Sequence, residues 1–347
     1  MPLLSAADLQ SRIDRLPRVP LAFLPTPLVE CPRLSEKLCG PRIWMKRDDL
    51  TGLAFGGNKT RMLEFWMAEA RNAGADVVIT GASLQSNHCR QVAAAANRLG
   101  LKTALVLFGK IEGEIQGNLL LDAILGAEIH NVQSGDFSTL RENLYAAQRA
   151  YQDRGFKPYV IDGLGPSSVL GAVAYVECAL ELLPQMQQSS LMVDYLVIPS
   201  GSGSTHAGLA LGAKVLGFGS KVFGISVRRT AREIRHSVAN IANQAARVLD
   251  LSVTLDPEEI LVDDSCVGRG YGIPTEEGLE AIRVVARTEG VLLDPTYSGK
   301  VMSGLIRLIH QQHLDSDSRI VFLHSGGGPI LFARSSFLSS DARIETI

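Results

Sequence analysis

Short runs of apolar and β-branched residues alternate with longer amphipathic stretches along almost the whole chain. Most of the short runs are apolar on both faces, which is typical of strands in a parallel sheet that helices cover on two sides. Strands and helices in alternation predict right-handed βαβ units and an α/β layered fold. The candidate strands are Arg42–Lys46, Asp76–Thr80, Thr103–Phe108, Ala127–Val132, Pro158–Ile161, Tyr195–Pro199, Val222–Val227 and Arg319–Leu323.

Lys59 stands where a loop gives way to one of the amphipathic stretches. It ends the paired-glycine turn in the segment AFGGNKTR, and an apolar stripe at helical spacing runs from Leu63 to Ala70 directly after it. A lysine on the first turn of a packed helix, beside glycines that let another molecule come close, is well placed to react. Taken alone, however, the pattern favours a solvated lysine after a turn. The rest of the chain has to decide between the two.

The length of the chain predicts two domains. Its 347 residues are too many for one small core, and eight candidate strands suggest two sheets. We expect boundaries near residue 55 and near residues 165–175, where new strand-loop-helix units begin. The 46% of hydrophobic residues is an ordinary globular composition with ample apolar surface to bury.

Charge and cysteine content exclude several kinds of partner. The net charge of −2 provides no basic field for nucleic acid or an anionic membrane, and we expect no stretch of about 20 uncharged apolar residues that would span a bilayer. The five cysteines are scattered and never form CxxC, which indicates a reducing cytoplasm and no zinc ribbon. His310 and His313 have a spacing that some metal sites use, but no third ligand is near in the sequence, so we expect no metal.

A loop of small and hydroxyl residues follows the candidate strand Tyr195–Pro199. Backbone N–H groups and hydroxyls of Gly201, Ser202, Gly203, Ser204 and Thr205 would converge at the start of a helix, whose positive end favours an anion. No lysine follows as in a P-loop, and His206 stands where a dinucleotide fingerprint needs its third glycine. A single phosphate ester fits best, while Arg228-Arg229 after the next strand keep a nicotinamide enzyme open.

Three further loops carry candidate chemistry. Gln85, Ser86, Asn87 and His88 form a polar cluster that opens the predicted helix Asn87–Leu99 and suits a carboxylate or oxygen anion, although Ser86 can equally be a helix cap. A nucleophile elbow is improbable there because its closing glycine is missing. Tyr271 and Tyr297 lie in Pro/Gly loops, where surface tyrosines are common. Gly326, Gly327 and Gly328 end the last strand and permit close approach of a planar ligand.

Six of these segments together resemble one family. FGGNKTR, GASLQSNHCRQVAA, PSGSGSTHAGLALG, GYGIP, LDPTYSGK and FLHSGGGP are similar to the D-cysteine desulfhydrase and 1-aminocyclopropane-1-carboxylate deaminase family, within the fold-type II (tryptophan synthase β-like) pyridoxal 5'-phosphate enzymes. The resemblance runs from about residue 22 to Ala333. It implies two three-layer αβα domains with mostly parallel sheets. Residues 1–54 and 169–347 would form the larger, phosphate-binding domain and residues 55–168 the smaller one.

The resemblance also implies roles for site residues. Lys59 would form the Schiff base and Asn87 would face the cofactor 3′-oxygen, while residues 201–205 hold the phosphate. Ser86 would lie near the substrate carboxylate, within a substrate-binding group that includes Gln85, Asn87, His88 and Ser298. Tyr271 and Tyr297 would line the substrate side as catalytic residues, and Ser325 would contact the cofactor. Either Tyr297 or Ser86 would assist proton transfer as a further catalytic residue, and the sequence does not rank the two. Family members also suggest a homodimer.

Two positions separate the branches of the family. The deaminases share a Glu directly after the tyrosine of DPxY and a Leu within HLGG, whereas the desulfhydrases have Ser or Thr at both positions. In this chain Ser298 and Ser325 occupy the two positions. A hydroxyl in place of a carboxylate leaves the cofactor ring nitrogen largely neutral, which suits prompt loss of a β-leaving group. We therefore expect α,β-elimination on a small amino acid, foremost D-cysteine, giving pyruvate, sulfide and ammonia.

Several alternatives stay open from the sequence. Ser325 in place of the more usual Thr leaves L-cysteate as a rival substrate, followed by β-chloro-D-alanine and then 1-aminocyclopropane-1-carboxylate. A pyridoxal-phosphate racemase would need the same lysine and an acid on the opposite face. An NADP-binding dehydrogenase and an inactive cofactor-binding protein are the remaining classes.

Overall fold

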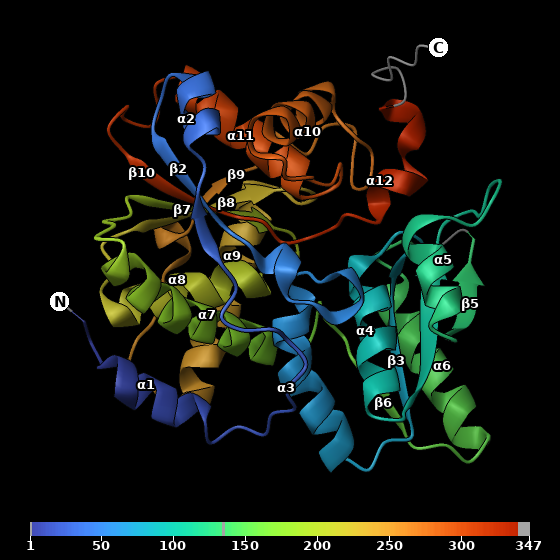
Figure 1. The fold of residues 1–347 in the computed structure, drawn as a ribbon. Coiled ribbons are helices and arrows are strands. Elements are labelled where there is room, and N and C mark those ends of the chain that lie inside the picture. The colour runs from blue at the N-terminus through green and yellow to red at the C-terminus, as the bar shows by residue number, and fades with distance from the viewer. Residues whose placement is uncertain (1, 134–135, 339–347) are drawn as a thin grey trace.

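Two sheets organise the computed structural model, which describes residues 2–133 and 136–338 (Figure 1). The strands are β1 Leu28–Glu30, β2 Arg42–Lys46, β3 Val77–Ser83, β4 Lys102–Phe108, β5 Glu128–Val132, β6 Pro158–Val160, β7 Tyr195–Ser200, β8 Lys221–Ser226, β9 Leu261–Asp263 and β10 Arg319–Leu323. Six strands form the larger sheet in the order β1-β2-β10-β7-β8-β9, and four form the smaller one in the order β5-β4-β3-β6. Neighbouring strands are parallel except β1 and β2, which are antiparallel.

Helices cover both faces of each sheet, which gives the two αβα units. The helices are α1 Ala6–Ile13, α2 Pro32–Leu38, α3 Lys59–Asn72, α4 Asn87–Arg98, α5 Gly117–Ile124, α6 Leu140–Asp153, α7 Ser168–Gln188, α8 Ser204–Leu216, α9 Ala231–Val248, α10 Glu276–Glu289, α11 Ser298–His310 and α12 Ile330–Ala333. One face of the larger sheet packs on α7, α8 and α9, and the other on α2, α10 and α11. In the smaller sheet α6 covers one face and α4 with α5 the other. The predicted fold class is confirmed.

The predicted strands differ from the observed ones in two respects. First, β1 and β9 were not predicted, because three residues each are too few to show a pattern. Second, β3 extends to Ser83, so Gly81 lies inside the strand and not in the loop after it. A β-carbon at Gly81 would lie 2.3 Å from the carbonyl oxygen of Val106 on the neighbouring strand, so only glycine fits there.

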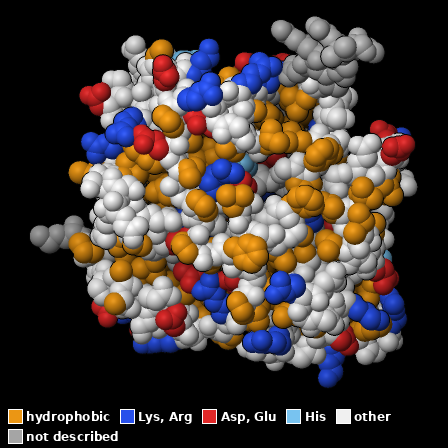
Figure 2. All heavy atoms as spheres, viewed as in Figure 1, with side chains coloured by type: hydrophobic (Ala, Val, Ile, Leu, Met, Phe, Trp, Pro, Cys, Tyr) orange, Lys and Arg blue, Asp and Glu red, His pale blue; other side chains and the backbone are white. Residues whose placement is uncertain are grey.

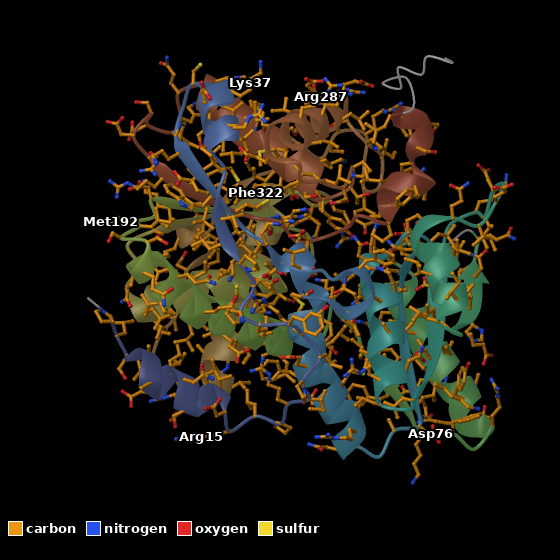
Figure 3. All side chains as sticks on the ribbon, in the orientation of Figure 1. Arg15, Lys37, Asp76, Met192, Arg287 and Phe322 are labelled. Atoms are coloured by element: carbon orange, nitrogen blue, oxygen red, sulfur yellow. The ribbon has the colours of Figure 1, made fainter. Side chains whose placement is uncertain are left out.

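Apolar side chains fill the layers between sheets and helices. Phe322 of β10 is completely buried, and Figure 3 shows it inside the body, whereas Lys37, Arg287 and Met192 lie at the margin. Helix α7 is, by length and composition, apolar enough to cross a membrane, although it contains Glu177 and Glu181 and 61% of its most apolar window is buried inside the protein. It packs on α8 as a core helix does.

Helix α3 joins the two sheets. Its side chains belong to the largest core cluster, which also contains Val78 of β3 and Leu196 of β7. Near its start, the Arg61 guanidinium pairs with Asp48 Oδ1 at 2.9 Å and with Glu181 Oε2 of α7 at 2.8 Å. These buried ion pairs hold the first turn of α3 against the larger sheet. The strands between residues 77 and 160 make up the smaller sheet, and the exact domain limits of 54/55 and 168/169 stay a prediction.

Candidate active site

A cavity lies where the carboxyl ends of strands from both sheets meet. Its wall includes Ala82 at the end of β3 and Pro199 near the end of β7, and the space free of protein atoms, its open mouth included, is about 1050 Å³. Ligand sites of α/β proteins commonly lie at this edge of a parallel sheet. Eleven of the predicted site residues line the cavity: Lys59, Ser86, Asn87, His88, Gly201, Ser202, Gly203, Thr205, Tyr271, Tyr297 and Ser325. Gln85, Ser204 and Ser298 do not.

Lys59 is the first residue of α3, and its amine has no acidic partner in the described part of the chain. Its Nζ contacts Met62 Sδ at 3.7 Å. Burial without a counter-charge lowers the pKa of Lys59 from 10.5 to about 8. A substantial fraction of the amine is therefore neutral near physiological pH, which is the form that attacks a carbonyl carbon.

The paired glycines before Lys59 serve a close protein contact. Gly57 has a φ of +126°, and a β-carbon there would lie 2.7 Å from Gln91 Nε2. A β-carbon at Gly326 would in turn lie 2.7 Å from Gly57 Cα, and one at Gly327 would lie 2.5 Å from Asp294 Cγ. Two of the glycines expected to admit a planar ligand are thus needed by the packing of the chain on itself. The contact seats the loop of Ser325 beside Lys59.

The loop 201–205 has the geometry of an anion site. It connects β7 to the thirteen-residue helix α8, and Gly203 with φ +104° precedes the first helical residue. Arg229 Nη2 donates to the carbonyl oxygen of Ser202 at 3.2 Å, and Asn58 Nδ2 donates to Thr205 Oγ1 at 3.1 Å. The loop is thereby held to the segment that follows β8 and to the turn that precedes Lys59. Ser204 is buried as the first residue of α8 and lies behind the wall.

Asn87 is oriented from behind by α5. Its Oδ1 accepts from Asn118 Nδ2 at 2.8 Å and from Arg90 Nη2 at 3.5 Å, and Arg90 Nε donates to Asn118 Oδ1 at 2.8 Å. With its oxygen so engaged, Asn87 keeps its amide hydrogens for the cavity. Gln85 is part of the same connection: its Oε1 accepts from the Asn118 backbone nitrogen at 2.9 Å, so it links the turn to α5 instead of reaching the cavity.

His88 lines the cavity as a neutral side chain. Thr80 Oγ1 donates to the Ile161 carbonyl oxygen at 2.8 Å, so toward His88 Nε2, also at 2.8 Å, it can only accept. Nε2 therefore carries the hydrogen. Burial, and after it the charge of Lys59, lowers the pKa of His88 to about 3. His88 can contribute hydrogen bonding and shape to the site but no positive charge.

Two tyrosines form the opposite wall. The hydroxyl groups of Tyr271 and Tyr297 are hydrogen-bonded to each other, and their rings meet edge to face with centroids 5.9 Å apart. Tyr297 immediately precedes α11. Burial is the first cause that raises the pKa of both phenols. Both keep their protons at neutral pH and can act as donors.

The two serines of the branch positions differ in placement. Ser325 lies on the cavity wall, whereas Ser298 is completely buried in the first turn of α11, where its Oγ donates to Asp294 Oδ1 at 2.7 Å. Asp294 also accepts from the Tyr297 backbone nitrogen at 2.9 Å and so fixes the turn that precedes this helix. Ser298 can therefore act on a ligand through the position of Tyr297.

Sequence reasoning missed several wall residues. Asn58, Trp66, Phe137 and Asp162 line the cavity, and so does Arg228, which the sequence suggested only for a nicotinamide enzyme. Asp162 follows β6 at the carboxyl edge of the sheet, so its position in the sequence was an available signal. Trp66 belongs to the predicted apolar stripe of α3 and is buried in the core, and its indole Nε1 donates to the Ser167 carbonyl oxygen at 2.7 Å. In the described residues no group of three or more His, Cys, Asp and Glu could hold a metal ion.

Comparisons with known proteins agree with this arrangement. A family model described as "Pyridoxal-phosphate dependent enzyme" matches residues 19–326. A solved structure titled "Crystal Structure Analysis of the ACC deaminase homologue" superposes with a TM-score of 0.87 at 35% sequence identity, covering 96% of this chain and 98% of that one.

The residues on the wall fit the cofactor of that family. Lys59 offers a partly neutral amine for its aldehyde, the 201–205 loop offers N–H groups and hydroxyls for a phosphate ester, and the oriented amide of Asn87 offers a donor for a ring oxygen. The match over most of the chain and the fit of the cavity lead to one conclusion: the chain belongs to the family of pyridoxal-phosphate-dependent enzymes.

Proposed function

We propose that the protein is a lyase that catalyses α,β-elimination on a small β-substituted alanine, with D-cysteine as the first candidate substrate and L-cysteate as the second. The products from D-cysteine are pyruvate, sulfide and ammonia. The observation that carries the proposal is the acid content of the wall. Among described wall residues Asp162 is the only acid, and it is paired with Arg141 Nε at 3.0 Å. Ser325 thus has no carboxylate beside it on the wall.

The hydroxyl of Ser325, in place of a carboxylate, favours elimination. When bound, pyridoxal phosphate supplies an electron sink for the carbanion at the substrate α-carbon. A carboxylate beside the ring nitrogen would keep it protonated and support a long-lived carbanion, as ring opening of 1-aminocyclopropane-1-carboxylate requires. With Ser325 there, fast loss of a β-leaving group is favoured. The likeness to a structure titled as a deaminase homologue therefore supports the chemistry of the family more than that particular substrate.

The residues divide the work as follows. Ser86 Oγ accepts from the Cys89 backbone nitrogen at 3.2 Å, which leaves its own hydrogen to donate to the substrate carboxylate. Lys59 Nζ would take the α-proton of the substrate as the general base. The protonated phenol of Tyr297, supported by Tyr271, would donate to the leaving sulfur. Trp66 and Phe137 restrict water near the reacting carbons.

The test is a keto-acid assay on the holoenzyme with both enantiomers of cysteine, cysteate, serine and 3-chloroalanine, and with the cyclopropane amino acid. We expect pyruvate from cysteine or cysteate, and loss of both pyruvate and the visible absorbance of the bound cofactor in Lys59→Ala. Pyruvate formation by Lys59→Ala at the wild-type rate would refute the assignment. Chiral analysis of recovered substrate separates elimination from racemisation, and a colourless protein that binds NADP would favour a dehydrogenase.

We also propose that the enzyme works as a homodimer in the cytoplasm. The five cysteines are free, which suits a reducing compartment. Phe55, Leu120, Leu292 and Phe332 line one groove and expose 67%, 42%, 61% and 70% of their surfaces, an apolar face that a second copy would bury. Hydrophobic side chains gather in this region, over α12 and α5, in Figure 2. Light scattering should give twice the monomer mass, and Leu120→Asp should reduce it.

A further inference from the structure

Besides Lys59, a second cation on the cavity wall has no acidic partner among the described residues. Arg228 lies two residues beyond β8, and its guanidinium makes neither an ion pair nor a side-chain hydrogen bond with any described residue. Its contact is with the face of Phe137, with 4.2 Å between the guanidinium carbon and the ring centroid. The adjacent Arg229 donates to Ser202, and Arg141 is paired with Asp162. Arg228 alone among these arginines keeps its donors free toward the cavity.

The contacts of Arg228 place it at the tyrosine end of the cavity. The ring of Phe137, on which the guanidinium lies, meets Tyr271 edge to face at 5.1 Å, and Tyr271 bonds to Tyr297. Glu233 is the carboxylate whose charge reaches Arg228, but Glu233 is exposed and accepts from Thr230 in the capping box of α9. A half-buried guanidinium without a neutralising acid attracts an anion strongly.

Other parts of the cavity would bind the cofactor phosphate and the substrate carboxylate, so neither anion needs Arg228. The phosphate would occupy the 201–205 loop, whose tether is Arg229, and the substrate carboxylate would lie at Ser86 at the start of α4. We propose that Arg228 binds an anionic β-substituent of the substrate, which moves cysteate, the second candidate named above, ahead of D-cysteine. The site then prefers 3-substituted alanines whose leaving group carries a negative charge, above all a sulfonate. This inference rests on the proposed elimination and names the substrate class for it.

The reaction with a sulfonate balances without any oxidant. The Cα–H bond breaks and its proton passes to Lys59 Nζ, while the electron pair forms the Cα=Cβ bond. The Cβ–S bond breaks and its electron pair leaves with the sulfur as sulfite, beside the guanidinium of Arg228. Addition of one water to the remaining three-carbon fragment gives pyruvate and ammonia. A fork of N–H donors matches the oxygens of a sulfonate and of departing sulfite, whereas a thiol offers it one weak acceptor.

The experiment compares Arg228→Met and Arg228→Lys in the holoenzyme. Methionine keeps an apolar contact with Phe137 and removes the charge, while lysine keeps the charge and loses the fork. Arg232→Met, an exposed arginine in the first turn of α9, is the matched control. For each protein kcat and KM are measured with cysteate and with cysteine of the same chirality, and the cofactor dissociation constant is measured by absorbance titration.

We expect the ratio of kcat/KM for cysteate to that for cysteine to fall about 10- to 100-fold in Arg228→Met, chiefly through KM for cysteate, as loss of a charge-assisted hydrogen bond implies. Arg228→Lys should give an intermediate ratio, and Arg232→Met the wild-type ratio. An unchanged ratio in Arg228→Met overturns the inference. So does a weaker cofactor affinity with equal losses for both substrates, which would assign Arg228 to the phosphate.

Failure of the proposed function gives a different result. If the wild-type holoenzyme forms pyruvate from no amino acid, the elimination is wrong, yet the role of Arg228 can still be measured as binding. The dissociation constants of cysteate and alanine are then read from the change they cause in the cofactor absorbance. A cysteate preference that Arg228→Met abolishes supports the inference without turnover, and a preference that survives in this variant refutes it.

Discussion

Replacing Lys59 by methionine should stabilise the protein without its cofactor. The amine is held in a site that lowers its pKa from 10.5 to about 8, and no described acid compensates its charge. Below pH 8 the folded state must carry this desolvated cation, while the unfolded chain carries a solvated one. The cost to the free energy of unfolding at pH 7 is about 3 kcal/mol, because each pKa unit corresponds to about 1.4 kcal/mol. Partial solvent access makes this an upper bound.

The pH dependence of the effect identifies its cause. Since the folded-state pKa is lowered, the cost is complete below about pH 8 and disappears as pH rises through the unfolded-state value of 10.5. At pH 10 about 1 kcal/mol should remain. Any packing gained by the methionine is the same at both pH values, so the difference of about 2 kcal/mol between them reports the charge alone.

Urea unfolding of the apo-protein at pH 7 and pH 10, followed by fluorescence and circular dichroism, measures both values. Lys37→Met is the control, because Lys37 is exposed at the end of α2 and lies at the margin of the molecule in Figure 3; we expect a change within about 0.5 kcal/mol. A Lys59→Met protein that is less stable than wild type at pH 7 would refute the reasoning. So would a stabilisation that is equal at the two pH values.

Three further substitutions test other parts of the structure. Asn118→Ala frees the amide of Asn87 to rotate, so the cofactor dissociation constant should rise about 10-fold and the pH midpoint of its visible absorbance should shift; an unchanged spectrum would contradict the orienting role. Gly208→Ala brings a β-carbon to 2.1 Å from the Ala172 carbonyl oxygen, where α8 packs on α7. The free energy of unfolding measured in urea should therefore fall by about 3 kcal/mol. Asp48→Asn removes one of the two carboxylates that pair with the buried Arg61 and leaves it only Glu181, which Lys46 shares, so it should cost about 3 kcal/mol or more at pH 7. Because the paired arginine lowers the pKa of Asp48 against burial, this difference should shrink as pH falls through that lowered value.

Local features of the sequence were sufficient wherever one segment sets its own conformation. The alternation of strands and helices, the first turn of α3 at Lys59 and the small-residue loop before α8 were all predictable, because hydrophobic period and turn chemistry act within a few residues. The short strands β1 and β9 were not predictable, because their pairing partners stabilise them and their own three-residue patterns do not.

Side-chain direction was decided by tertiary structure. Gly326 packs closely on Gly57 and Gly327 on Asp294, and the Gln85 side chain is hydrogen-bonded to α5. None of these contacts is visible in the sequence, since each joins segments far apart along the chain. The same holds for the neutral tautomer of His88.

The chain by itself therefore determined the fold class and the cofactor family, and it predicts Lys59 as the lysine that binds the cofactor, through motifs that constrain backbone and chemistry together. Only the tertiary structure decided which polar groups the chain itself occupies and which it leaves free for a ligand. Ser298 is occupied by Asp294, whereas Arg228 is left without an acid. The physical reason is that a buried polar group must find a partner, and the partner is set by the packing of distant elements.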